Sequence, residues 1–241
     1  MRYFTREYIK NSQNIIQDGI LTIDDRAGVK DEAFYRELYQ ENYNSRRSAW
    51  GSGFTEDEFR ENFNGALQFF KEKLPESIIS KIADFRVAAL ETVSPEIYQD
   101  ITEHSKMLSQ HCEEAEASYR KDYAENKKYF SASCQKALEC DISDARILKY
   151  EENEEQLILF FSLDTYTIEN DYDLMYIFKK GKFTEKLGIL ENAWLYTYEI
   201  YAAEASIEFH IISSEDFQCI IQAEDMDYRY SESFKYREGI E

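Results

Sequence analysis

Glycine, proline and histidine are scarce in this sequence, whose 241 residues include only 8 Gly, 2 Pro and 3 His. So few turn-forming residues disfavour collagen-like segments, low-complexity linkers and repeat arrays with regular turns. So few histidines leave little material for a metal centre or for imidazole catalysis. The longest apolar stretches, such as 157–163, are far shorter than the roughly 20 residues that a membrane helix needs. We therefore predict a globular protein that does not cross a membrane.

Cysteine motifs and export signals are also lacking. The four cysteines, Cys112, Cys134, Cys140 and Cys219, form neither a C-x-x-C motif nor a paired zinc spacing. The opening MRYFTREYIK is charged and interrupted, unlike the apolar stretch of a signal peptide. Together these features predict reduced thiols and a cytoplasmic location.

Acidic residues, in contrast, are abundant. The chain has 48 Asp and Glu against 28 Lys and Arg, a formal net charge of −20. Residues 1–145 hold 19 basic and 27 acidic side chains and residues 146–241 hold 9 and 21, so the excess is denser in the second part. This charge repels phosphate backbones, which predicts no nucleic-acid binding. It either keeps the chain soluble or attracts a basic protein partner.

Helical spacing of apolar residues predicts that residues 1–141 form a helical region, and 43% hydrophobic residues suffice for a core. The clearest start signal is Thr55 with Glu58 three residues later, a capping box flanked by the hydrophobic pair Phe54 and Phe59. The other predicted helices follow Thr5, span Asp31 to Tyr43, run from Pro75 through Leu90, and extend from Pro95 to about Leu138.

After residue 141 the apolar period changes from 3.6 to 2, which predicts a β-rich region over 142–241. Tight polar connections, one of them near Ala203, favour antiparallel pairing. The predicted strands cover 146–151, 156–163, 174–180 and three tail segments at 194–200, 207–211 and 217–221. The fold class is therefore α+β, an N-terminal helical bundle followed by a C-terminal antiparallel β-meander.

No metal centre, cofactor or catalytic residue is predicted. His104 and His111 lie seven residues apart on the long helix, about 10 Å along its axis. Two ligands of one zinc ion must each approach it to about 2.1 Å, and Cys112 adds no chelating pair. Residues 170–173 lack the glycine and the terminal glutamate of a calcium-binding loop. No nucleophile motif of the G-x-S-x-G type occurs.

His210 is the histidine with the most suggestive surroundings, on the polar face of its predicted strand. If the preceding turn is centred on Ala203, Thr197 lies opposite His210 and Glu199 lies diagonally from it. On the other side, Ile220 or a neighbour flanks His210. An imidazole beside carboxylates could titrate near neutral pH or act as a general base. The same pattern also occurs on any polar sheet face.

Several short motifs stand in a recognisable order: M-R-Y-F-T-R-E at the start, I-A-D-F-R-V at 82–87, and W-L-Y, E-F-H and A-E-D at 194–196, 208–210 and 223–225. Together they resemble an uncharacterised bacterial family, a domain of unknown function of about this length. That family places a His-Asp pair where the β part begins. Here Ser143 and Asp144 stand at that place, so Asp144 matches and the histidine does not. The resemblance implies a free-standing bacterial protein and transfers no activity.

The candidate binding residues are therefore Asp144, Glu199, His210, Glu224 and Asp225. Because the chain is so acidic, adjacent carboxylates such as Glu224 and Asp225 are also expected by chance. The charge, together with many interface-prone tyrosines, favours a non-enzymatic intracellular protein-binding module for a basic partner. The alternatives are a hydrolase or small-molecule enzyme with a site between the helical and β parts, and a dimeric scaffold that uses an exposed tyrosine face.

Overall fold

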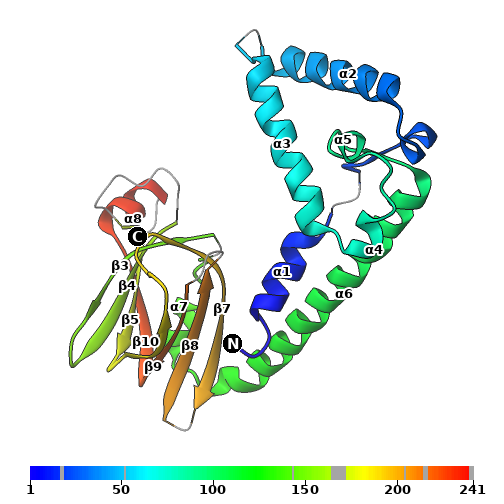
Figure 1. Ribbon diagram of the computed structural model, residues 1–241. Helices are drawn as coiled ribbons and strands as arrows, with labels where there is room; N and C mark the ends of the chain where they lie inside the picture. The colour runs from blue at the N-terminus through cyan, green and yellow to red at the C-terminus, as the bar shows by residue number, and fades with distance from the viewer. Residues whose placement is uncertain are drawn as a thin grey trace. The chain divides into compact units, whose positions relative to one another are not determined.

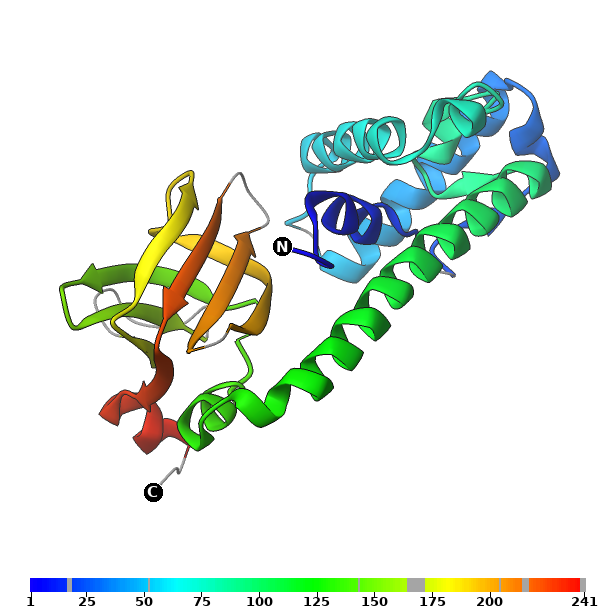
Figure 2. The same ribbon diagram turned by 90° about the horizontal axis from the view of Figure 1, so that it is seen from below.

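The computed structural model describes residues 1–16, 19–51, 53–142, 144–163, 172–203, 205–213 and 217–238 (Figure 1, Figure 2). The chain divides into two compact units. We call Lys10–Glu113 the helical unit, and Met1–Ile9 together with Glu114–Glu241 the sheet unit. The predicted fold class, helices first and an antiparallel sheet after them, is confirmed.

Helices dominate the helical unit. Among its described residues, the two-residue strands β1 and β2 form a parallel pair. The elements from the start of the chain to this unit's end are α1 (Arg6–Asn14), β1 (Thr22–Ile23), the 3-10 helix η1 (Asp25–Gly28), α2 (Glu32–Trp50), α3 (Glu56–Lys73), α4 (Glu76–Ile79), α5 (Phe85–Ala88), β2 (Thr92–Val93) and the first part of α6 (Pro95–Asn126).

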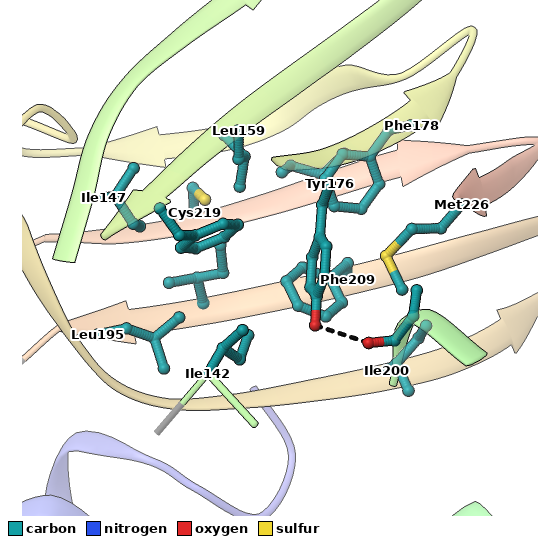
Figure 3. Packing of buried hydrophobic residues seen from close by; sticks show 14 of the residues in the cluster. Ile142, Ile147, Leu159, Tyr176, Phe178, Leu195, Ile200, Phe209, Cys219 and Met226 are labelled. Atoms are coloured by element: carbon teal, nitrogen blue, oxygen red, sulfur yellow. Dashed lines mark hydrogen bonds between the residues drawn. The ribbon is translucent and has the colours of Figure 1, made fainter. Parts of the chain in front are cut away.

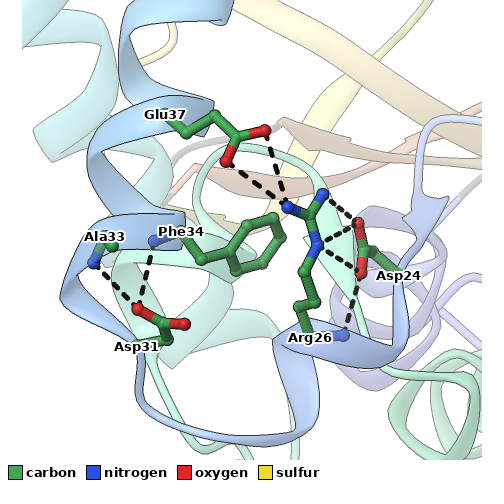
Figure 4. Close-up of polar contacts among 6 residues, drawn as sticks. All are labelled: Asp24, Arg26, Asp31, Ala33, Phe34 and Glu37. Carbon is green, nitrogen blue, oxygen red and sulfur yellow. Dashed lines mark hydrogen bonds and ion pairs between the residues drawn. The ribbon is translucent and has the colours of Figure 1, made fainter.

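Side-chain caps set the start of several helices. The predicted capping box of α3 is confirmed, since Thr55 accepts from the backbone N–H of Glu58 and Glu58 accepts from that of Thr55. Asp31 caps α2 by accepting from the backbone N–H groups of residues 33 and 34 (Figure 4). The helix continues beyond the predicted Tyr43 because no stop signal occurs before Gly51, whose φ of 87° ends it.

Two predicted helices are wrong in extent. Residues 75–90 form the separate helices α4 and α5, because the Asp84 carboxylate accepts from the Arg86 N–H at 2.9 Å and starts a new helix there. The long helix α6 ends at Asn126 instead of continuing to Leu138. A 3-10 turn η2 (Lys127–Tyr129) follows, and then Ser131 caps the short helix α7 (Ala132–Ala137).

An eight-stranded antiparallel sheet forms most of the sheet unit. Its order is β10-β5-β4-β3-β7-β8-β9-β6, so two meanders, β3 to β5 and β7 to β9, meet side by side. The strands are β3 (Arg146–Glu152), β4 (Gln156–Ser162), β5 (Leu174–Lys179), β6 (Lys182–Leu187), β7 (Ala193–Ala203), β8 (Ser206–Ser213), β9 (Gln218–Ala223) and β10 (Asp225–Tyr230), followed by α8 (Glu232–Glu238).

One hydrophobic core joins the inner faces of both meanders (Figure 3). The Phe209 ring of β8 lies 5.4 Å from that of Phe178 and 6.0 Å from that of Tyr176, both on β5. The buried Tyr176 hydroxyl donates to the carbonyl of Ala137 at 2.8 Å, which fastens α7 against this core. Alternation predicts one shared face for Leu157, Leu159, Phe161 and Leu163. The first three belong to this core, and the partly buried Leu163 packs against it. The predicted inward residues of the later strands belong to the core as well: Ile207, Phe209, Ile211, Phe217, Cys219 and Ile221.

Strand β7 departs from the predicted alternation. Alternation along residues 194–200 predicts one shared face for Trp194, Tyr196, Tyr198 and Ile200. Trp194 is instead 40% exposed, while Leu195 is buried. A register shift between Leu195 and Thr197 accounts for the difference, because an extra residue moves the following side chains to the other face.

Across the part of the chain that the structure describes, no helix combines the length and the apolar character needed to cross a bilayer.

Candidate functional site

Glu199 and His210 lie directly opposite each other on β7 and β8. The predicted pairing of His210 with Thr197 is wrong. Ala203 pairs with Ser206, so the turn is centred one residue later than predicted, and the partner of His210 moves two positions, to Glu199. Ile220 of β9 flanks His210 on its other side, as expected. Both side chains belong to the sheet face opposite the core, yet both are buried.

The start of the chain covers this face, and Glu199 fastens it there. One carboxylate oxygen of Glu199 accepts from the backbone N–H of Tyr3 at 2.8 Å and of Phe4 at 2.5 Å. The other oxygen accepts from the N–H of Arg2 at 2.8 Å and from the Tyr201 hydroxyl. Glu199 is 0% exposed. A side chain on the outer sheet face thus becomes the anchor of a segment almost two hundred residues away.

This carboxylate is fully occupied by its donors. An ionised carboxylate offers about four lone-pair positions, and three backbone N–H groups and one hydroxyl fill them. The Arg2 guanidinium lies 4.1 Å from the centre of the Tyr201 ring and places positive charge nearby. Burial and the hydrogen bond to Glu199 raise the pKa of Tyr201, so its hydroxyl stays protonated and donates. Glu199 is therefore arranged to hold a segment, with no acceptor position left for a substrate.

Helix α6 holds the same segment from another side. The Tyr3 hydroxyl donates to Asp122 at 2.6 Å, and the Tyr8 hydroxyl to Glu116 at 3.1 Å. Tyr119 packs edge-on against Phe4, with ring centres 5.0 Å apart. The Tyr119 hydroxyl also accepts from the backbone N–H of Ile200 at 3.0 Å, which ties α6 to β7.

His210 is 6% exposed and packs edge-on against the Tyr201 ring at 5.0 Å. Its Nε2 lies 3.3 Å from a Glu208 carboxylate oxygen, while its Nδ1 has no hydrogen-bond partner among the described residues. Burial lowers the pKa of His210, and the positive amino terminus lowers it further, against the opposite effects of Glu208 and Glu199. A neutral, enclosed imidazole is the result.

Glu224 and Asp225 lie apart from this centre, where β9 passes into β10. Glu224 pairs with Lys180 at 2.6 Å and Lys179 at 3.3 Å, and Asp225 accepts from the Ser131 hydroxyl at 2.7 Å. Both carboxylates line an open pocket of 350 Å³, together with Tyr129, whose residue surface is 67% exposed. We call this the acidic pocket.

Asp144 occupies a third place. It is exposed in the connection that precedes β3, with a φ of 59° that Asp adopts more readily than most residues. Its neighbour Ser143 lies outside the described residues. Within the part that the structure describes, no hydrogen bond or ion pair joins Asp144 to His210 or to Asp225. The five candidate residues therefore fall into three separate places.

Metal ligands and thiols are the remaining groups of chemical interest in the described ranges. Among the residues placed there, no group of three or more His, Cys, Asp or Glu side chains converges as a metal site. Asn170 and Asp171, from the segment whose sequence does not fit a calcium-binding loop, lie outside the described residues. The four cysteines, all of them among the described residues, are buried and form no disulfide. Burial raises the pKa of Cys134 and of Cys219 to about 12, so neither thiol ionises near neutral pH.

The sequence pattern pointed to Glu199 but not to its partners. Arg2, Tyr3 and Phe4 contribute backbone N–H groups, which leave no mark in side-chain identity. One partner of Glu199 could have been found from the sequence. Tyr201 follows Glu199 by two positions, so the two side chains lie on the same face of the strand.

No protein-family model, curated protein or solved structure matches this chain. The resemblance to an uncharacterised bacterial family therefore stays a prediction.

Proposed function

We propose that this chain is a protein-binding module whose acidic pocket receives a lysine or arginine side chain of a basic partner. The observation that carries the proposal is the meeting of Glu224, Asp225 and the exposed ring of Tyr129 in one pocket. Carboxylates pair with a guanidinium in a planar, two-bond geometry, and an aromatic face attracts the same cation.

The present partners of Glu224 are easily exchanged. Lys179 and Lys180 have side chains 67% and 58% exposed, and ion pairs at such positions contribute little to stability. A partner cation that enters the pocket can take over part of this pairing at small cost. One carboxylate oxygen of Asp225 accepts from the Ser131 hydroxyl and from the backbone N–H of Met226, which leaves the other oxygen to accept from a partner's side chain.

The surroundings favour such a partner. The net charge of −20 attracts a basic protein over distances of about one Debye length, roughly 8 Å at physiological ionic strength. A binding role also agrees with the centre at Glu199, whose acceptor positions all serve the chain itself.

The test is the affinity for an arginine-containing peptide, followed by fluorescence anisotropy on the full chain. The double variant Glu224→Gln/Asp225→Asn removes two charges from the pocket. The matched control, Glu152→Gln/Glu154→Gln, removes two charges from exposed positions in and next to the β3–β4 turn. We expect the pocket variant to bind at least about tenfold more weakly than the control, the equivalent of one charge-assisted hydrogen bond.

A further variant and a check of folding complete the design. Tyr129→Ala keeps the net charge and should weaken binding through the lost cation–π contact. Circular dichroism checks that Asp225→Asn keeps the fold, since Asp225 also bonds Ser131. Equal losses in the pocket variant and the control variant would reduce the effect to non-specific charge and refute the proposal.

A further inference from the structure

A second pocket of the sheet unit has the opposite charge. It measures 520 Å³ and is lined by residues of α7, the edge strand β10 and α8. Lys136 of α7, Arg229 of β10 and Lys235 of α8 line it, with one carboxylate, Asp227. We call this the basic pocket. In a chain with a net charge of −20, a concave surface with a local excess of positive charge needs an explanation.

The one carboxylate in the basic pocket is held in place by two hydrogen bonds to one of its oxygens. Asp227 accepts from the Ser133 hydroxyl at 2.6 Å and from the backbone N–H of Tyr228 at 2.8 Å. It therefore serves to fix α7 against β10. Within the described ranges, Lys136 and Arg229 form no ion pair, while Lys235 pairs with the exposed Glu232 at 3.1 Å. The pocket keeps at least two cations available for an anion.

The walls of the basic pocket are held in place by the core. Cys134 and Ala137 of α7 are fully buried, and the carbonyl of Ala137 accepts from Tyr176. On the other side the Tyr230 ring stacks on the Phe234 ring of α8, with centres 5.0 Å apart and planes at 18°. Elements anchored in this way fix the backbone positions from which the three cations project, so binding does not have to order the backbone.

We propose that the basic pocket binds a small phosphate-bearing molecule. Arg229 supplies a planar fork of N–H donors that matches two phosphate oxygens, and Lys136 and Lys235 add point charges. The volume falls within the range of small-molecule sites. The half-buried rings of Tyr228 and Tyr230, whose planes meet at 84°, give the pocket an aromatic wall for a ring attached to the phosphate. This site is independent of the acidic pocket and of the proposed basic partner.

The experiment is calorimetric titration of the full chain with AMP, inorganic phosphate and adenosine. AMP should bind, and adenosine, which lacks the phosphate, should not. Arg229→Gln should weaken AMP binding at least about tenfold, the value of one charge-assisted hydrogen bond. Arg229 is exposed, so this variant is expected to fold. Lys121→Gln, an exposed lysine of α6 outside the pocket, should leave AMP binding unchanged.

Three results would overturn the phosphate site, and a fourth would overturn only the part played by the tyrosines. Absence of AMP and phosphate binding at millimolar concentration would overturn the site, as would equal AMP affinity in the native chain and in Arg229→Gln. Equal losses for Arg229→Gln and Lys121→Gln would assign the effect to overall charge and overturn it as well. Binding of AMP no tighter than that of inorganic phosphate would keep the anion site and overturn the role of the tyrosine wall.

Discussion

Replacing Glu199 by Gln tests whether one buried carboxylate holds the start of the chain. Glutamine has the same shape, but its amide group carries an N–H₂ where Glu199 has its second oxygen. Whichever way the amide turns, two of the present donors face another donor. In one orientation these are the N–H of Arg2 and the Tyr201 hydroxyl, and in the other the N–H groups of Tyr3 and Phe4.

The magnitude follows from the number of bonds lost. A hydrogen bond to a charged group contributes about 1.5–3 kcal/mol, so two lost bonds cost about 3–6 kcal/mol. The Tyr201 hydroxyl can rotate and accept from the new amide, which places the expected loss near the lower end, about 3 kcal/mol. That free energy corresponds to about a hundredfold change in an equilibrium constant. The opening of the N-terminal segment should become more frequent by this factor.

Amide hydrogen exchange at Tyr3 and Phe4 measures that opening directly, since exchange reports local unfolding. Tryptic cleavage after Arg2 and Arg6 should accelerate in parallel. For the sheet unit as a whole, urea unfolding in a Trp50→Phe background leaves Trp194 as its fluorescent reporter, because the chain has 2 Trp.

Glu208→Gln is the matched control, since it removes one charge from β8 and leaves the bonds of Glu199 intact. Unchanged exchange at Phe4 in Glu199→Gln would show that other contacts hold the segment, and the reasoning would fail. An equal increase in both variants would assign the effect to charge alone.

Three further changes test packing, titration and capping. Gly181→Ala should destabilise the sheet unit by about 1–3 kcal/mol in urea unfolding, because the added Cβ would lie 2.5 Å from the Cβ of Phe178. The control Gly65→Ala places its Cβ in open space on α3 and should be neutral or stabilising. Equal effects of the two substitutions would contradict the packing argument. Burial lowers the pKa of His210 in the folded chain below the ordinary 6.5, so the neutral ring's contribution to folding stability is complete above that pH and is lost as the pH falls. The urea midpoint of His210→Gln should therefore drop less from pH 8 to pH 5 than the midpoint of the native chain. Parallel pH curves for the two proteins would exclude His210 as the titrating group. Thr55→Ala should cost the helical unit about 1 kcal/mol in thermal unfolding, whereas Thr55→Ser should cost much less, and equal losses would argue against the cap.

Local features of the sequence predicted much of the fold. The capping box at Thr55 and Glu58 depends on residues three apart, and the structure forms it as expected. The alternation around Ile207, Phe209 and Ile211 likewise depends on neighbours along one strand. The helix from 75 to 90 was wrong because apolar spacing continued through Asp84, and the pattern did not weigh that residue's capping bond. The site was harder to predict, because moving the centre of one turn by a single residue moves the partner of His210 by two positions, from Thr197 to Glu199.

The sequence by itself determined the order of helices and strands, the capping signals and the negative charge, since each depends on composition or on residues close together in the chain. Only the tertiary structure decided that Glu199 is an anchor. Its donors are backbone N–H groups of residues 2 to 4, and any amino acid except proline carries that group. The pairing therefore follows from where the chain folds back onto β7, and no side-chain pattern records it.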